Sequence, residues 1–274
     1  MKYPTVFHIT HYKAGSQWVA EILKHSAPER FVTPQAYSDH VSQVPLKAGS
    51  IYPTVYLTRP KVEVVLQGLE GRHRLFVVQR DLRDTLVSLY FSIKISHKIL
   101  NPRQQYTRGV LQQLSVEDGL LKLLGSEVDQ PALARLLRLP TKTRVRAFDS
   151  LETRHLVFPL TMAANAAIQR SWLTADVLHL RYEDLIADEF AIFTQIIDYC
   201  EIDVPSDHLH NIIKYNTFES VTGRARGEED QAAHQRKGIT GDWRNYFTDR
   251  IKEQFKTMYG DVLVATGYEQ DFDW

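Results

Sequence analysis

Short apolar runs along this chain alternate with longer stretches in which apolar residues recur every three or four positions. The short runs predict buried strands at residues 5–10, 55–58, 75–78 and 177–180. The longer stretches predict helices at residues 16–25, 62–69, 81–96, 110–124, 133–139, 163–173, 183–199, 207–214 and 250–265. This alternation predicts an α/β fold with a mostly parallel central sheet flanked by helices on both faces.

Neither an internal repeat nor a low-complexity segment divides the chain, so we expect a single domain over residues 1–274. Lysine plus arginine equal aspartate plus glutamate at 33 each, which argues against broad binding to nucleic acid or to an anionic membrane. The single cysteine, Cys200, excludes an intrachain disulfide. No apolar run of about 18 residues occurs, and the first predicted strand follows the N-terminus directly, so we expect a soluble cytoplasmic protein.

A short turn joins the first predicted strand to the first predicted helix. It contains Lys13 and Gly15, and it ends at Trp18. A helix N-terminus presents backbone N–H groups and a favourable dipole to an anion, and a lysine adds a mobile cation. The turn therefore predicts a phosphate-binding site that is P-loop-like. Its spacing is not that of an ATP or GTP P-loop.

Three later segments carry further candidate chemistry. Arg80 ends a predicted strand, and Ser88 follows two turns into the next helix, where ligands of open α/β sheets gather. The adjacent cations Arg236 and Lys237 precede a Gly-x-x-Gly-Asp-Trp sequence. Residues 180–185 end another strand and open another helix with acidic residues that suit a helix N-terminus.

Taken in this order, the four segments resemble the motifs of the PAPS-dependent sulfotransferases, most closely the cytosolic small-molecule branch. PAPS is 3′-phosphoadenosine-5′-phosphosulfate, and PAP is the 3′,5′-bisphosphate that remains after transfer. Residues 13–18 look like the family's 5′-phosphosulfate loop, and residues 80–88 look like its 3′-phosphate motif. Residues 182–185 and 236–243 look like its later motifs. The resemblance spans residues 5–260 and implies the sulfotransferase fold.

The resemblance also implies a role for each matching residue. Lys13 would bind the 5′-phosphosulfate and stabilise the charge that develops as sulfur leaves. The remaining implied nucleotide contacts are Ala14, Gly15, Ser16 and Gln17 at the 5′-phosphate, Trp18, Tyr182 and Phe218 at the adenine, and Arg80, Ser88, Arg236, Lys237 and Gly238 at the 3′-phosphate. The family mechanism requires no metal.

The general base of the family is usually a histidine between the first two motifs, and Arg59 occupies the corresponding position here. Arginine stays protonated and cannot accept a proton. Three interpretations are open: a nearby group replaces the histidine, the segments are aligned incorrectly, or transfer chemistry has been lost. The candidate replacement bases are Glu63, Asp39, His40 and His97.

We therefore expect PAPS as donor, PAP as product and a small, partly apolar alcohol or phenol as acceptor. Residues 31–63 and 90–160 would form the acceptor pocket, with the aromatic residues Tyr37, Tyr52, Tyr56, Phe91, Tyr106 and Phe148. Two other functions remain open: a PAP- or PAPS-binding protein without transfer activity, and an NTP-dependent kinase. Asp249 interrupts the family's dimer segment, so the sequence does not give the oligomeric state.

Overall fold

A computed structural model describes residues 3–34, 40–43, 45–99, 102–125 and 162–274. Its centre is a parallel sheet of four strands in the order β2-β1-β3-β4. The strands are β1 (Thr5–Thr10), β2 (Ile51–Val55), β3 (His73–Gln79) and β4 (Leu178–Arg181). The predicted α/β class with a parallel sheet is therefore confirmed.

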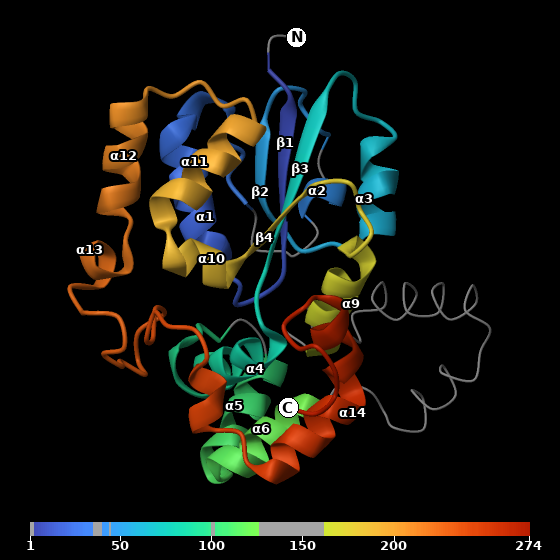
Figure 1. Ribbon diagram of the computed structural model, residues 1–274, viewed down its shortest axis with the longest axis vertical. Coiled ribbons are helices and arrows are strands. Elements are labelled where there is room, and N and C mark those ends of the chain that lie inside the picture. The colour runs from blue at the N-terminus through green and yellow to red at the C-terminus, as the bar shows by residue number, and fades with distance from the viewer. Residues whose placement is uncertain (1–2, 35–39, 44, 100–101, 126–161) are drawn as a thin grey trace.

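Helices of the described ranges cover the two sides of this sheet, and others form a layer below it in the view of Figure 1. Their bounds are α1 (Ser16–Ser26), η1 (Pro28–Arg30), α2 (His40–Gln43), α3 (Arg59–Leu66), α4 (Leu82–Phe91), η2 (Ser92–Ser96), α5 (Pro102–Gln113), α6 (Val116–Gly125), α9 (Met162–Trp172), α10 (Tyr182–Ala187), α11 (Glu189–Tyr199), α12 (Ser206–Tyr215), α13 (Phe218–Thr222), η3 (Asp242–Asn245) and α14 (Asp249–Ala265). None of them is long and apolar enough to cross a membrane.

Side chains of β1 alternate between the two faces of the sheet. Val6 packs with α1, α11 and α12 on one face, whereas Phe7 and Ile9 pack with α3 and α9 on the other. Both faces are thus covered, as the continuous apolar character of the strands requires.

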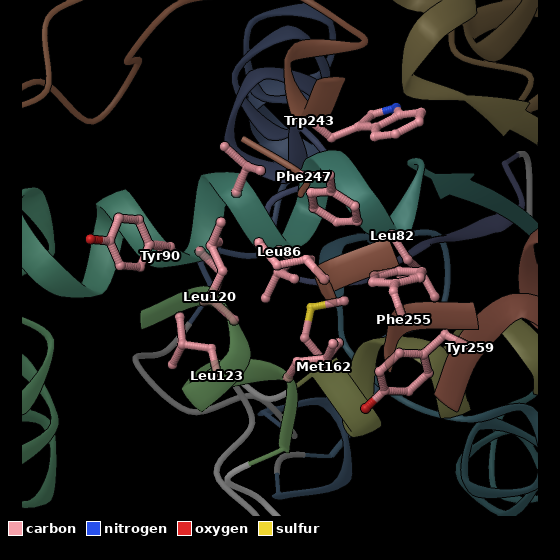
Figure 2. Packing of buried hydrophobic residues seen from close by; sticks show 14 of the residues in the cluster. Leu82, Leu86, Tyr90, Leu120, Leu123, Met162, Trp243, Phe247, Phe255 and Tyr259 are labelled. Atoms are coloured by element: carbon pink, nitrogen blue, oxygen red, sulfur yellow. The ribbon is translucent and has the colours of Figure 1, made fainter. Parts of the chain in front are cut away.

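A third core forms among helices beyond the carboxyl ends of the strands, in the lower half of Figure 1. Leu82, Leu86 and Tyr90 of α4 pack against α6, α9 and α14 (Figure 2). Phe247 joins this core just after η3, so the segment that carries Arg236 and Lys237 is attached to the same helical layer. The motifs predicted to bind phosphate consequently meet between the sheet and this layer.

Several predicted elements differ from the structure, among them the helix predicted at 62–69, which lies earlier, at Arg59–Leu66. The strand predicted at residues 55–58 lies earlier, at Ile51–Val55, because β2 is an edge strand and tolerates Pro53, which has no N–H to donate. The helix predicted at 183–199 is two helices, since Asp188 caps α11 by accepting a hydrogen bond from Ala191 N. The helix predicted at 110–124 is also two, α5 and α6, with the Ser115 hydroxyl accepting from Asp118 N where α6 begins. The helix predicted at 133–139 lies outside the described residues.

Candidate functional site

The turn between β1 and α1 holds the backbone in two left-handed positions. Lys13 has a φ of 68° and Gly15, which caps α1, has a φ of 77°. A Cβ on Gly15 would lie 2.8 Å from the ring of Tyr182, so only glycine allows this close approach. Ser16 begins α1 with its hydroxyl 2.7 Å from the Tyr56 hydroxyl. The backbone N–H groups in the first turn of α1 have no partner within the helix, and they therefore face the compact turn that holds Lys13 and Gly15.

Arg80, at the carboxyl end of β3, lies directly beside this turn. Its Nη1 donates to the Lys13 carbonyl at 3.0 Å and its Nη2 donates to the Ile239 carbonyl at 3.1 Å. Its guanidinium also stacks 4.4 Å above the centre of the Tyr182 ring. Arg80 thus joins the first motif to the segment that follows Lys237 and Gly238.

Asp84, in the first turn of α4, fixes the start of η3. Its carboxylate accepts hydrogen bonds from Gly241 N at 2.6 Å and Trp243 N at 2.9 Å. Ser88 follows Asp84 by one turn of α4, so both lie on the same side of that helix. The Ser88 side chain is half-buried.

The adjacent cations Arg236 and Lys237 both bind Asp242. Arg236 donates to Asp242, and Lys237 donates to its other oxygen at 2.7 Å. Arg236 also pairs with Glu229 and stacks 4.4 Å above the ring of Phe91. These contacts hold both cationic side chains in defined positions on a folded loop.

Aromatic rings border the site at two places. Trp18 packs edge-on against Phe193 at 5.0 Å and against Tyr182 at 6.5 Å. Gly238 has a φ of 64°, and a Cβ there would lie 2.5 Å from the ring of Phe218. The three predicted adenine contacts, Trp18, Tyr182 and Phe218, therefore lie beside the glycine turns.

Three cations converge on this region. Burial, together with the charges of Arg80 and Arg236, lowers the pKa of Lys13 to about 8. Separated positive charges at strand ends and a helix N-terminus suit a ligand with several phosphate groups. The arrangement of these three cations can therefore bind such a ligand.

His97, directly after η2, lies within the electrostatic influence of Lys13. Burial lowers the pKa of His97, and the charges of Lys13 and Arg108 add to this effect. The imidazole is therefore neutral near pH 7 and able to accept a proton. His234 belongs to the same group, since burial, Lys13 and His97 lower its pKa to about 4. Sequence reasoning missed His234, although it precedes the Arg236 motif by only two residues.

The other candidate bases are placed differently. Glu63 is more than half exposed and pairs with Arg59 at 2.7 Å across one turn of α3. The Arg59 backbone N–H donates to the Ser171 hydroxyl at 3.0 Å. His40 is the first residue of α2, and its side chain is outside the described part of the structure, as is Asp39 altogether. Of these candidates, His97 is the only one among the described residues whose pKa the charge of Lys13 lowers.

His11, directly after β1, is a buried histidine. Arg80 N and the Gln169 amide both donate to its Nε2, at 3.1 and 2.8 Å. Its Nδ1 therefore carries the proton and donates to the Tyr12 carbonyl at 3.0 Å. Burial lowers the pKa of His11 to about 4, so this neutral form persists and locks the end of β1 to the end of β3.

The aromatic residues predicted for the acceptor pocket lie in different parts of the structure. Tyr52 is buried in the sheet core and stacks on Phe7. Tyr56 stacks on Tyr12 beside the turn, with ring centres 4.1 Å apart. Phe91 lies under Arg236, and Tyr106 is exposed on α5. Tyr37 and Phe148 lie outside the described residues.

In the described residues, no group of three or more His, Cys, Asp or Glu side chains is arranged to hold a metal ion.

Comparison with known proteins supplies the family. The profile of the family described as "Sulfotransferase domain" matches residues 4–267. Mouse Sulfotransferase 2A6 is 31% identical over 97 residues, which cover 32% of this chain and 34% of that protein. Flavonol 3-sulfotransferase of Flaveria bidentis is 32% identical over 106 residues, which cover 33% and 34%. The matched part of the chain thus spans about a third of the length of these curated relatives.

Solved structures with the same fold extend over the whole chain. A mouse sulfotransferase, SULT7A1, in complex with PAP superposes with a TM-score of 0.60 at 15% identity, covering 98% of this chain and 89% of that one. Retinol dehydratase in complex with retinol and PAP superposes with a TM-score of 0.50 at 14% identity, covering 96% and 82%. At such low identity these likenesses establish the fold.

Proposed function

The chain belongs to the sulfotransferase family, and on that premise we propose that it moves a sulfuryl group from PAPS to a hydroxyl or amine of a small, partly apolar acceptor, with PAP as product. The observation that carries the proposal is the convergence of Lys13, Arg80 and Arg236 at one end of the sheet. PAPS has a phosphosulfate at its 5′ end and a phosphate on its 3′ oxygen. The turn at Gly15 suits the first group and the Arg236–Lys237 pair suits the second.

Lys13 has two tasks in this proposal. Its ammonium holds the 5′-phosphosulfate, and it stabilises the negative charge that grows on the bridging oxygen as the sulfur–oxygen bond breaks. Arg80 holds the Lys13 backbone in its left-handed conformation through the 3.0 Å hydrogen bond to the carbonyl. The ammonium is therefore directed from a fixed turn.

His97 is the base that we favour, because the positive charge of Lys13 acts on it. In the proposed step its neutral imidazole takes the proton of the acceptor hydroxyl, the acceptor oxygen bonds to sulfur, and the bond from sulfur to the 5′-phosphate oxygen breaks. PAP leaves with that oxygen and its electron pair. The low pKa that burial and Lys13 give His97 keeps it available as a base at neutral pH.

We infer the chemical character of the acceptor from the side chains around His97. Ile95 and Ile99 are more than one-third exposed beside it, and Tyr106 of α5 is exposed as well. Such a surface suits an acceptor with apolar area. Two similar proteins carry names that fit, a flavonol 3-sulfotransferase and a retinol dehydratase that binds retinol.

We also propose a single domain and a cytoplasmic location, supported by the family match over residues 4–267 and by the unpaired, buried Cys200.

Two measurements test the proposal. Calorimetry with PAP is expected to give a saturable 1:1 isotherm, and radiolabelled sulfate is expected to pass from PAPS to at least one member of a panel of phenols and aliphatic alcohols. Binding of ATP without binding of PAP would contradict the proposal and favour a kinase. Tight binding of PAP with no transfer to any acceptor would favour a nucleotide-binding protein that has lost its chemistry.

A further inference from the structure

Of the buried polar side-chain atoms without a hydrogen-bond partner in the described part of the chain, three lie in one cluster. They are Nε1 of Trp18, Oε2 of Glu189 and Nη1 of Arg226. Trp18 is on α1, Glu189 begins α11, and Arg226 is in the loop after α13. Nearly all buried polar groups in proteins are partnered, and a missing partner costs about 1–3 kcal/mol. Three in one cluster need an explanation.

The contacts of Arg226 define the cluster. Its Nη2 donates to Glu189, and its guanidinium carbon lies 6.0 Å from the centre of the Trp18 ring. Phe193, one turn after Glu189 on α11, packs against the same tryptophan. Tyr182 contacts Trp18 from the side of the Gly15 turn. The unpaired atoms are thus continuous with the phosphate-binding turn.

Anchoring of the loop after α13 does not by itself explain the ion pair between Glu189 and Arg226. Arg226 already has a second carboxylate, because its Nε lies 3.4 Å from Glu219, a residue whose side chain is about half exposed. Two carboxylates therefore account for Nε and Nη2 of the guanidinium, while Nη1 stays unpaired. Glu189 in turn uses one oxygen for Arg226 and leaves the other without a donor.

We propose that Glu189 and Arg226 recognise the edge of the adenine base in the donor nucleotide. Adenine places a donor, its exocyclic amine, beside an acceptor, its ring nitrogen N1. The free oxygen of Glu189 accepts from the amine, and Nη1 of Arg226 donates to the ring nitrogen, while Trp18 packs against the base. The inference rests on the proposed function, since it assigns the base-reading residues of the same nucleotide site.

If Glu189 and Arg226 recognise the base by hydrogen bonds, the site discriminates between purine bases of the same shape, which packing against Trp18 alone would not do. Inosine 3′,5′-bisphosphate has the same phosphates as PAP, but a carbonyl replaces the amine and N1 becomes a donor. It therefore opposes acceptor to acceptor at Glu189 and donor to donor at Arg226. Sites built to hydrogen-bond a ligand group reject analogues that lack it, because buried polar atoms are then left unpaired.

The experiment is calorimetry with PAP and with inosine 3′,5′-bisphosphate on the wild type, Glu189→Gln and Glu219→Gln. The wild type is expected to prefer PAP by about tenfold or more. In Glu189→Gln the amide oxygen faces Arg226 and the amide nitrogen faces the base, so PAP weakens, inosine bisphosphate strengthens, and the preference is lost or reversed. Glu219→Gln is the matched control, because it removes a carboxylate from Arg226 without touching the proposed base contact, and it should keep the wild-type preference.

Each result has a clear meaning. Equal binding of the two bisphosphates by the wild type, or an unchanged preference in Glu189→Gln, would overturn the base-reading pair while leaving PAP binding intact. Failure of the wild type to bind PAP at all would instead overturn the proposed function. If Glu189→Gln lowered the melting temperature too far for calorimetry, Arg226→Lys would take its place, because it keeps the positive charge beside Glu189 but removes the Nη1 donor. An unchanged preference for PAP in Arg226→Lys would overturn the base-reading pair.

Discussion

The side chain of Arg80 donates a hydrogen bond from Nη1 to the backbone carbonyl of Lys13 at 3.0 Å. This contact joins two motifs that are 67 residues apart in the sequence. It also makes the proposed 3′-phosphate cation a support of the proposed 5′-phosphosulfate turn. The two ends of the nucleotide site are therefore mechanically coupled, and substitutions at either end should affect both binding and transfer.

Replacing Lys13 with methionine should lower kcat by about 100-fold or more, because the charge that stabilises the leaving oxygen is removed. Lys24→Met is the matched control, since Lys24 is exposed on α1 and pairs only with Glu21 among the ion pairs of the described residues. Steady-state transfer assays measure both. A Lys13→Met enzyme with undiminished turnover would contradict the assignment of the turn.

The affinity for PAP should fall as the pH rises past about 8. The pKa of Lys13 is lowered to about 8 in the free protein by burial and by its cationic neighbours. The anionic nucleotide favours the charged form and raises this pKa, so binding takes up a proton at pH values above about 8 and weakens there. Calorimetry at about pH 8.5 in buffers of different ionisation enthalpy measures the uptake. Lys13→Arg should show none, since arginine stays protonated.

Replacing His97 with glutamine should lower kcat by about 100-fold while leaving the affinity for PAP unchanged within about twofold. The pKa of His97 is lowered by burial, Lys13 and Arg108, so the neutral base is present at pH 7 and above. The kcat of the wild type should thus be flat above neutral pH and fall only in the acidic range. His25→Gln, at an exposed site on α1, is the control. An equal loss in both variants would remove His97 as the base.

Replacing Glu229 with glutamine should tighten PAP binding by about tenfold, or about 1.4 kcal/mol. Glu229 pairs with Arg236, and the Glu229 side chain is about one-quarter exposed, whereas Asp242 is nearly fully buried and also binds Lys237 and Asn245. Glu229 therefore competes with a 3′-phosphate for Arg236, while Asp242 positions that guanidinium. Calorimetry with AMP, which lacks the 3′-phosphate, should show no gain. A gain for AMP as large as that for PAP would speak against this competition.

Replacing Asp84 with asparagine should destabilise the protein by about 2 kcal/mol, because a buried carboxylate that accepts two backbone N–H groups becomes an amide that can accept at only one oxygen. The melting temperature should fall by about 5 °C. Asp261→Asn is the control, since Asp261 forms an exposed ion pair with Arg170 that contributes little. Thermal unfolding followed by circular dichroism compares them, and equal midpoints would show that Asp84 does not hold η3.

Local signals predicted much of the fold correctly. β1 matches its predicted bounds, and α1, α9, α12 and α14 match within about one residue, since apolar spacing and caps act over a few neighbours. β2 was misplaced because its tolerance of Pro53 depends on being at the sheet edge, which is a property of the assembled sheet. The break at Asp188 within the predicted helix depends on a cap that apolar periodicity does not register.

Residue type and spacing alone were enough to recognise the α/β class, the order of the motifs and the family they resemble, as Lys13, Arg80 and Arg236 illustrate. How these residues meet depends on the folded arrangement of the chain. It brought Arg80 onto the Lys13 carbonyl, His97 into the field of Lys13, and Glu189 next to Arg226 and Trp18. Charge, burial and unpaired polar atoms depend on contacts between residues distant in sequence, and these arise only when the sheet and its helices assemble.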